Sequence, residues 1–260
     1  EGEGARVEPP ALPAIDRLVV ACGPQVGLSK SVQLSSGIGG TALTAVAQLD
    51  DPGHLPLDWY GYEGVETVIL ATSQAEPYRA LTADSERIAA LTRWVELGGH
   101  LVIFCGREAP EFLGPQGALA GLAPGQFVEM APLRNSTPLE LFAAAEDPIV
   151  RGRLNLRVPK LKDVEGQILS HAGRNPEDLP LIVRTRRQLG QITFVAVDPD
   201  QPPLADWSGR DGLLQRVLAW PRRAADDPTA DENILTGERF DDLSGQLRAA
   251  LDVQFAGIQP

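Results

Sequence analysis

The chain has 260 residues, of which 43% are hydrophobic and 22% charged, and a formal net charge of −12. This composition is typical of a soluble globular protein, and its acidity argues against binding to nucleic acid or anionic lipid. No apolar run approaches the length of a membrane span, and two cysteines are too few for a multi-bridge disulfide framework. Because the sequence begins with Glu-Gly-Glu-Gly instead of Met, we expect a piece of a longer protein whose signal or anchor lies outside it.

The first half of the chain is organised around short apolar runs. Residues 1–14, rich in Glu, Gly and Pro, are expected to form a lead-in segment. Four apolar runs then predict buried strands, because runs of this length bounded by turn residues are typical of a parallel sheet. They cover residues 15–22, 42–50, 65–71 and 101–105.

One amphipathic helix is predicted between the last two of these strands. Thr82 is expected to be its N-cap, and Gly98-Gly99 is expected to end it. Ile88, Leu91 and Val95 then fall on one helical face. Strand, helix and strand over this length predict a βαβ unit, and therefore a parallel sheet with helices on its faces.

The second half of the chain predicts strands at a shorter spacing. They cover residues 125–130, 153–161, 166–173 and a hairpin at 181–197 that turns around Arg187 to Gly190. A helix is expected at 212–220, closed by Pro221, and residues 221–260 are expected to be a linker and an amphipathic helix.

These elements predict an α/β fold. We expect a flavodoxin-like three-layer parallel sheet with additional antiparallel strands in the second half, in one domain over residues 15–220. The later strands are expected to extend or edge the same sheet.

Cys105, in the stretch GGHLVIFCGRE, ends a predicted strand where several α/β hydrolases keep their nucleophile. A reactive cysteine needs thiolate character and a tight turn, which usually has glycines two residues to either side of the nucleophile. Ile103 and Arg107 stand at those two positions. The simpler interpretation is a small hydrophobic residue at the end of a buried strand.

A catalytic thiol also needs a base, and the chain has three histidines. His54 lies in a loop, and His100 lies at the end of the strand opposite Cys105. His171 follows a predicted strand and is the one reasonable base, so a Cys105–His171 dyad is the catalytic alternative. In a strand order of 2-1-3-4, Cys22 and Cys105 are about 9–10 Å apart, beyond disulfide reach, so we predict two free thiols.

The residues alone allow two other kinds of binding site, one for a cation and one for a sugar. Asp198, Asp200 and Asp206 could bind a cation, although their spacing matches no EF-hand loop. Aromatic rings could instead provide stacking faces for a sugar, although core packing is the simpler explanation for them. The candidate rings are Trp59, Tyr60, Tyr62 and Trp207.

A resemblance to a known family covers about residues 15–220. The run GYEGVETVILATS … LTADSERIAALTRWVELGGHLVIFCG resembles the class I glutamine amidotransferase-like fold. The later EDPIVRG, GQILSHAG and LPLIVRTRRQLGQITFVAVDPD are similar to the second half of its trehalose-utilisation-like relatives, although Asp147 replaces the histidine of their His-Pro-Ile segment. The closing DDLSGQLRAALDVQFAGIQP is similar to the stretch before a transmembrane helix in large bacterial envelope proteins that carry such a domain.

The resemblance places Cys105 at the amidotransferase nucleophile position. The GxCxG elbow is absent, and the activating His-x-Glu pair has no match, since Ala172 and Gly173 follow His171. We therefore expect a non-catalytic domain that binds a small molecule or a protein. The alternatives are a thiol-dependent hydrolase or amidotransferase that uses Cys105 and His171, and a carbohydrate-binding domain.

The expected binding edge lies at the carboxyl ends of the parallel strands, where ligands bind in open α/β sheets. It comprises Cys22, Gly23, Thr72, Ser73, Gln74, Cys105, Gly106, Arg107 and Glu108. No cofactor and no metal are expected. The resemblance to envelope proteins implies an extracytoplasmic domain, attached to the cytoplasmic membrane through segments outside this chain.

Overall fold

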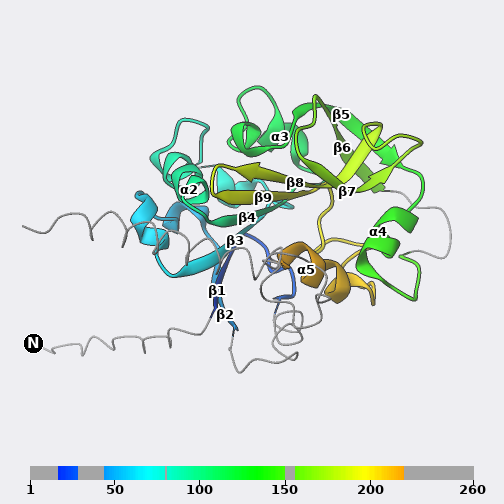
Figure 1. Cartoon of the computed structure of the whole chain (residues 1–260), viewed down its shortest axis with the longest axis horizontal. Coiled ribbons are helices and arrows are strands. Elements are labelled where there is room, and N and C mark those ends of the chain that lie inside the picture. The colour runs from blue at the N-terminus through cyan, green and yellow to red at the C-terminus, as the bar shows by residue number, and fades with distance from the viewer. Residues whose placement is uncertain (1–16, 29–43, 80, 150–155, 220–260) are drawn as a thin grey trace, which may run out of the picture. The chain divides into compact units, whose positions relative to one another are not determined.

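A seven-stranded mixed sheet with the order β2-β1-β3-β4-β9-β8-β7 forms the centre of the protein (Figure 1). The computed structural model describes residues 17–28, 44–79, 81–149 and 156–219. The predicted lead-in segment, the linker and the C-terminal amphipathic helix lie outside these residues.

Five strands of the sheet are parallel, as the apolar runs predict. They are β1 (Arg17–Cys22), β2 (Thr44–Leu49), β3 (Val65–Ala71), β4 (His100–Phe104) and β9 (Gly190–Val195). All residues of β4 and β9 are buried. A strand buried on both faces needs a continuous apolar run rather than an alternating one, which explains the sequence LVIF.

The helix between β3 and β4 is α2 (Glu86–Glu96), and its N-cap is Ser85 rather than Thr82. The Ser85 Oγ accepts a hydrogen bond from the Ile88 amide at 3.4 Å. The helix ends as predicted, since Gly98 has a φ of +123°, a conformation that favours glycine. The predicted βαβ unit is therefore confirmed, with its helix starting later than expected.

The second half of the chain completes the sheet with antiparallel strands. β8 (Leu179–Arg187) and β9 form the predicted hairpin, and β7 (Gln167–Ala172) pairs with β8 at the edge. β5 (Gln126–Leu133) and β6 (Leu156–Lys162) instead form a separate two-stranded sheet, so the expectation that they extend or edge the central sheet is wrong. Each carries a proline, which cannot donate to a strand ladder and therefore suits a small outlying pair.

Three further α-helices and four short 3-10 helices lie among the described residues. α3 (Ala109–Leu113) and α4 (Thr137–Ala143) are short helices that the hydrophobic pattern does not reveal. α5 (Arg210–Leu218) begins two residues before the predicted helix and packs against α4. No helix among the described residues is long and apolar enough to span a membrane.

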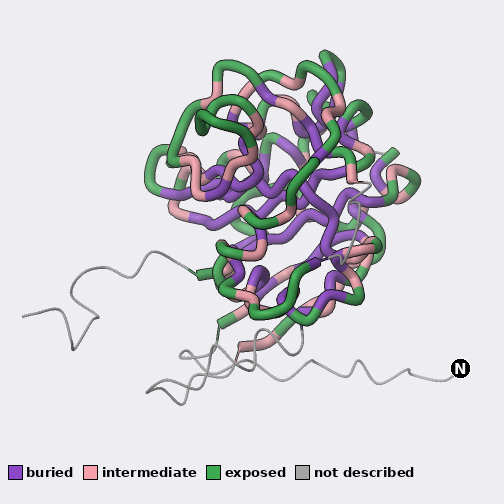
Figure 2. Tube along the Cα trace, turned by 90° about the vertical axis from the view of Figure 1, so that its right-hand side faces the viewer, coloured by how far each residue is buried: buried purple, intermediate pink, exposed green. Residues whose placement is uncertain are grey.

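Helices cover both faces of the sheet, with α2 and α5 on opposite sides (Figure 1). Figure 2 shows buried backbone running through the middle of this body, with most exposed residues in the outer loops. The protein therefore has the predicted α/β, flavodoxin-like three-layer fold. Its central strands end together at one carboxyl edge, close to the separate β5–β6 sheet.

Candidate functional site

Where β1 and β3 end, contacts within the protein occupy the carboxyl edge of the sheet. The Tyr78 hydroxyl donates to the carbonyl of Cys22 at 2.8 Å, and the Thr72 hydroxyl donates to the carbonyl of Phe104 at 3.0 Å. Gly23 has a φ of +92°, and a Cβ at this residue would lie 2.4 Å from the Ala71 carbonyl oxygen. Polar groups predicted to meet a ligand here are therefore engaged in internal contacts.

Ser73 and Gln74 follow β3 and have different surroundings. The Ser73 hydroxyl donates to the Asp200 carboxylate at 2.5 Å, which ties the loop after β3 to the loop after β9. Gln74 is exposed. Only Gln74, of these two, is available to a partner without breaking a contact within the protein.

Cys105 is completely buried at the end of β4. Burial raises the pKa of its thiol to about 12, since removal from water disfavours the thiolate. A hydrogen bond with Thr72 lowers this pKa, whereas the charges of Asp198 and Glu108 raise it further. The thiol is therefore protonated at neutral pH, which is the opposite of what a nucleophile requires.

The side chain of Asp198, from the loop after β9, lies against the turn that directly follows Cys105. Its carboxylate accepts hydrogen bonds from the backbone amides of Gly106 and Arg107, both at 2.8 Å, and its side chain is almost completely buried. Burial raises the pKa of Asp198, while these two amides lower it. In hydrolases with a nucleophile elbow, the amide after the nucleophile helps to form the oxyanion hole. Here a carboxylate of the protein already fills that position.

His171 does not lie beside Cys105. It is on β7, and β9 and β8 separate β7 from β4. Three strand spacings correspond to about 14 Å, far beyond a hydrogen bond. The structure therefore does not form the Cys105–His171 dyad that the catalytic alternative requires.

The group beside the Cys105 turn is instead the Asp198-x-Asp200 pair. A carboxylate cannot stabilise a neighbouring thiolate as an imidazolium can, because it has the same charge. This position therefore lacks the activating group.

The two remaining histidines lie away from the edge. His100 begins β4 at its opposite end and is fully buried between the hydroxyls of Thr67, 3.4 Å from Nδ1, and Thr193, 3.0 Å from Nε2. Burial lowers the pKa of His100 to about 3, and the charge of Arg184 acts in the same direction. His54 is exposed in a short helical turn.

The structure also bears on the predicted free thiols, the sugar-stacking rings and the cation site. Cys22 and Cys105 are both free and buried, with β3 between their strands as predicted. Trp59 and Tyr60 are exposed, with planes 79° apart, so they do not form one flat stacking face. Tyr62 stacks on Trp94 in the core, and Trp207 is buried with its ring nitrogen donating to the Asp147 carbonyl. Within the described residues, no group of three or more His, Cys, Asp and Glu side chains could hold a metal ion.

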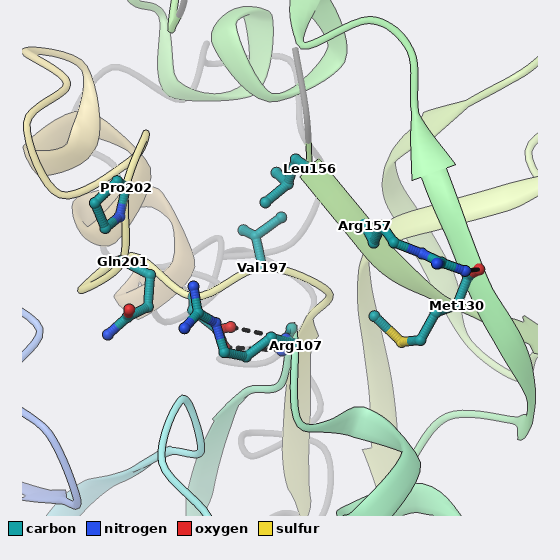
Figure 3. Close-up of a pocket in the computed structure, with 9 residues that line it drawn as sticks. Arg107, Met130, Leu156, Arg157, Val197, Gln201 and Pro202 are labelled. Carbon is teal, nitrogen blue, oxygen red and sulfur yellow. Dashed lines mark hydrogen bonds between the residues drawn. The ribbon is translucent and has the colours of Figure 1, made fainter.

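An open pocket of about 370 Å³ lies where β4 and β9 end, beside the β5–β6 sheet (Figure 3). Gly106 and Arg107 are the only lining residues that the predicted binding edge includes. The sequence interpretation missed most of the others, because they come from β5, β6 and the loop after β9, which only the tertiary fold brings together. The pocket is lined by Gly106, Arg107, Met130, Leu156, Arg157, Val197, Asp198, Gln201 and Pro202.

Two arginines in this pocket have different roles. Arg157 donates to the carbonyl of Met130 at 2.6 Å, and in Figure 3 it extends away from Arg107. Arg107 is exposed, and its side chain reaches across the pocket towards Gln201. Arg107, two residues after Cys105, therefore extends into the pocket, whereas Cys105 is not among the residues that line it.

The chain is similar to solved structures at low sequence identity. No protein-family model and no curated protein matches the chain. The chain is similar to the Salmonella typhimurium LT2 cytoplasmic protein STM1381, at 13% identity, a TM-score of 0.47 and coverage of 77% of this chain and 97% of that one. For the Salmonella typhimurium cytoplasmic protein STM3548 the values are 11%, 0.49, 77% and 96%.

A glycosidase shows a similar level of likeness. The exo-beta-1,4-mannosidase Op5Man5 from Opitutaceae bacterium strain TAV5 is 16% identical with a TM-score of 0.44, over 78% of this chain. This chain spans only 35% of that enzyme. Likenesses this distant establish no activity for this chain.

Proposed function

We propose that the protein is a non-catalytic, amidotransferase-like domain that acts as a ligand- or protein-binding module. The observation that carries this proposal is the carboxylate of Asp198 on the amides of Gly106 and Arg107. An acyl-transfer reaction would need those donors for a developing oxyanion. This internal carboxylate occupies the donors, and in its ionised form it also repels the negative charge that the reaction would create.

The state of Cys105 supports the same proposal. Its thiol is fully buried and protonated, and the group beside its turn is a carboxylate rather than an imidazole. Tyr78 and Phe112, whose rings make an edge-to-face contact at 5.2 Å, are both buried near this edge. A substrate would have to displace packed side chains to reach the sulfur.

Thiol alkylation of the intact protein tests the proposal. With a pKa near 12, Cys105 should react with iodoacetamide at pH 7.5 at least about a thousandfold more slowly than an exposed thiol, because its thiolate fraction is that much smaller. The rate is followed by mass spectrometry, with Cys22→Ser isolating Cys105 and a denatured sample giving the unprotected rate. Rapid modification of Cys105 in the folded protein would refute the proposal.

An activity assay provides a second test against the catalytic alternative. Glutaminase and esterase activities of the wild-type protein should equal those of Cys105→Ser, which removes the sulfur with little change in volume. Activity that disappears in Cys105→Ser, and also in His171→Gln, would establish the thiol-dependent enzyme instead.

We further propose that the module works outside the cytoplasm, held at the cytoplasmic membrane through segments outside this chain. The proposal is supported by the resemblance of the closing residues to a juxtamembrane stretch. Fractionation of cells that express the complete parent protein, followed by protease treatment of intact spheroplasts, would test it. Protection of the domain from protease in intact spheroplasts, with digestion only after lysis, would count against it.

A further inference from the structure

The pocket beside the β4–α3 turn is lined by both apolar and polar side chains. Its volume of about 370 Å³ is at the lower end of the range for small-molecule sites, so it suits a small ligand. Four apolar side chains contribute to the wall, and such a lining favours a ligand with an apolar body. These side chains are Met130, Leu156, Val197 and Pro202.

The charges that line the pocket differ from the charge of the whole chain. Two lining residues are arginines and one is an aspartate, whereas the chain has a formal net charge of −12. The Asp198 carboxylate is almost completely buried and accepts two backbone amides, so its capacity to bind a ligand cation is already largely used. Because Arg157 is hydrogen-bonded to the Met130 carbonyl, Arg107 is the lining residue that can bind an anion.

Arg107 is the cation with unused donors in this pocket. Its side chain is exposed and reaches across the pocket in Figure 3. None of the salt bridges seen between described residues involves Arg107, although its charge lowers the pKa of the nearby Asp198. A planar guanidinium with free N–H groups matches a carboxylate, which it can bind through two parallel hydrogen bonds.

A second polar group lies opposite this guanidinium. The Gln201 amide nitrogen donates to the Asp200 carboxylate at 2.7 Å, which fixes the amide and leaves its oxygen as an acceptor. The same oxygen, Oδ2 of Asp200, also accepts from the Ser73 hydroxyl, while Oδ1 is buried without a hydrogen-bond partner among the described residues. The rim next to Gln201 can therefore accept a hydrogen bond from a hydroxyl group of a ligand.

We infer that this pocket binds a small organic carboxylate, with the carboxylate on the Arg107 guanidinium and a short apolar body against Met130, Leu156 and Val197. The inference rests on the proposed function, because a domain that has lost catalysis at Cys105 can keep a ligand site beside it. It also names the ligand class of that module.

Calorimetric and NMR titrations of the full chain with matched probes test this inference. The probes are 4-methylpentanoate, its neutral isostere 4-methylpentanamide, and inorganic phosphate. We expect saturable binding of the carboxylate alone, weakened about tenfold or more in Arg107→Gln, because a charge-assisted hydrogen bond is lost. The control is Arg186→Gln, an exposed arginine on β8 near the opposite edge of the sheet, and it should bind as the wild type does.

Three results would overturn the inference. They are equal binding of the amide and the carboxylate, binding of phosphate without the carboxylate, and no saturable binding at up to about 10 mM probe. If Cys105 is alkylated slowly and one of these three results is obtained, the ligand inference fails but the proposed non-catalytic function is retained. Rapid alkylation of Cys105 overturns the proposed function itself, so the two failures are distinguishable.

Discussion

His100 is a buried base whose surroundings keep it neutral. Burial lowers its pKa from 6.5 to about 3, and its ring nitrogens lie between two threonine hydroxyls. In the unfolded chain the imidazole of His100 takes up a proton near pH 6.5. In the folded protein the same group is protonated only near pH 3, because its pKa is lowered to about 3. The unfolded state therefore binds more protons in this window, and stability is lost as the pH falls.

This difference predicts a specific pH dependence of stability. Below pH 6.5, His100 should reduce the free energy of unfolding by about 1.4 kcal/mol for each pH unit. Urea unfolding at pH 7.5, 6.5 and 5.5 would measure it, and His100→Gln should remove this part of the slope. The exposed His54→Gln variant serves as the control and should keep the wild-type slope. An unchanged slope in His100→Gln would contradict the assignment.

Asp198 has a structural role that can be measured apart from any activity. Replacing it with Ala removes the acceptor of two buried amides, so Asp198→Ala should lower the free energy of unfolding by about 2–3 kcal/mol. The control is Asp178→Ala, because the Asp178 carboxylate also accepts two backbone amides, at 3.0 Å each, but in an exposed loop. Denaturant titration should show a clearly smaller loss for the control.

At the scale of elements, the approach of α2 to the β8–β9 turn depends on a glycine. A Cβ on Gly190 would lie 2.0 Å from the Val95 carbonyl oxygen and 2.4 Å from that of Gly99. Both contacts are backbone atoms, which cannot rotate away. Gly190→Ala should therefore cost about 3 kcal/mol, whereas Gly121→Ala, with nothing within 4 Å of the added carbon, should change stability by less than about 1 kcal/mol. Thermal unfolding of the two variants compares them directly.

The start of α2 gives a second prediction at this scale. Ser85 caps the helix, so Ser85→Ala should cost about 0.5–1 kcal/mol, while Thr82→Ala should have almost no effect. Both hydroxyls lie before the same apolar stripe in the sequence, which makes each the other's control. A larger loss in Thr82→Ala would restore the N-cap predicted from the sequence.

The Ser85 result illustrates which features of elements a sequence can reveal. The stripe of Ile88, Leu91 and Val95 identifies the helix, because an amphipathic period is a local property. The period does not define the first residue of the helix, since a threonine and a serine three residues apart can both cap a helix. Likewise α3 and α4 are too short to show a period, and their place depends on what they pack against.

At the scale of the whole molecule, the sequence predicts the sheet better than the site. Val65 to Ala71 and Leu101 to Phe104 are continuous apolar runs, and only a sheet covered on both faces needs them. The pocket instead combines residues from the β4–α3 turn, β5, β6 and the loop after β9. No local pattern links Met130 to Val197, because their proximity is a consequence of the tertiary fold. The local signals for the pocket are Gly106 and Arg107 directly after β4, which belong to the predicted binding edge, and the acidic, proline-containing run DPDQPP after β9.

The net charge of the chain gives a prediction for the molecule as a whole. At neutral pH the charge of −12 should destabilise the folded state through repulsion, which salt screens. Raising NaCl from about 10 mM to about 0.5 M should therefore raise Tm by a few degrees. The gain should largely disappear near pH 4.7, the isoelectric point, where the repulsion is small. A fall in Tm with NaCl at neutral pH would contradict this expectation.

β9 lies between β4 and β8 in the sheet, so β4 cannot complete its strand pairing until β9 has been synthesised. β4 ends at Phe104, but the strand that covers its second edge begins at Gly190. Until the ribosome has released that later strand, β4 exposes an unpaired edge and apolar side chains that are buried in the finished protein. Nascent chains that stop before Gly190 should therefore aggregate or recruit chaperones, and the last strand of the sheet makes the first half of the protein soluble.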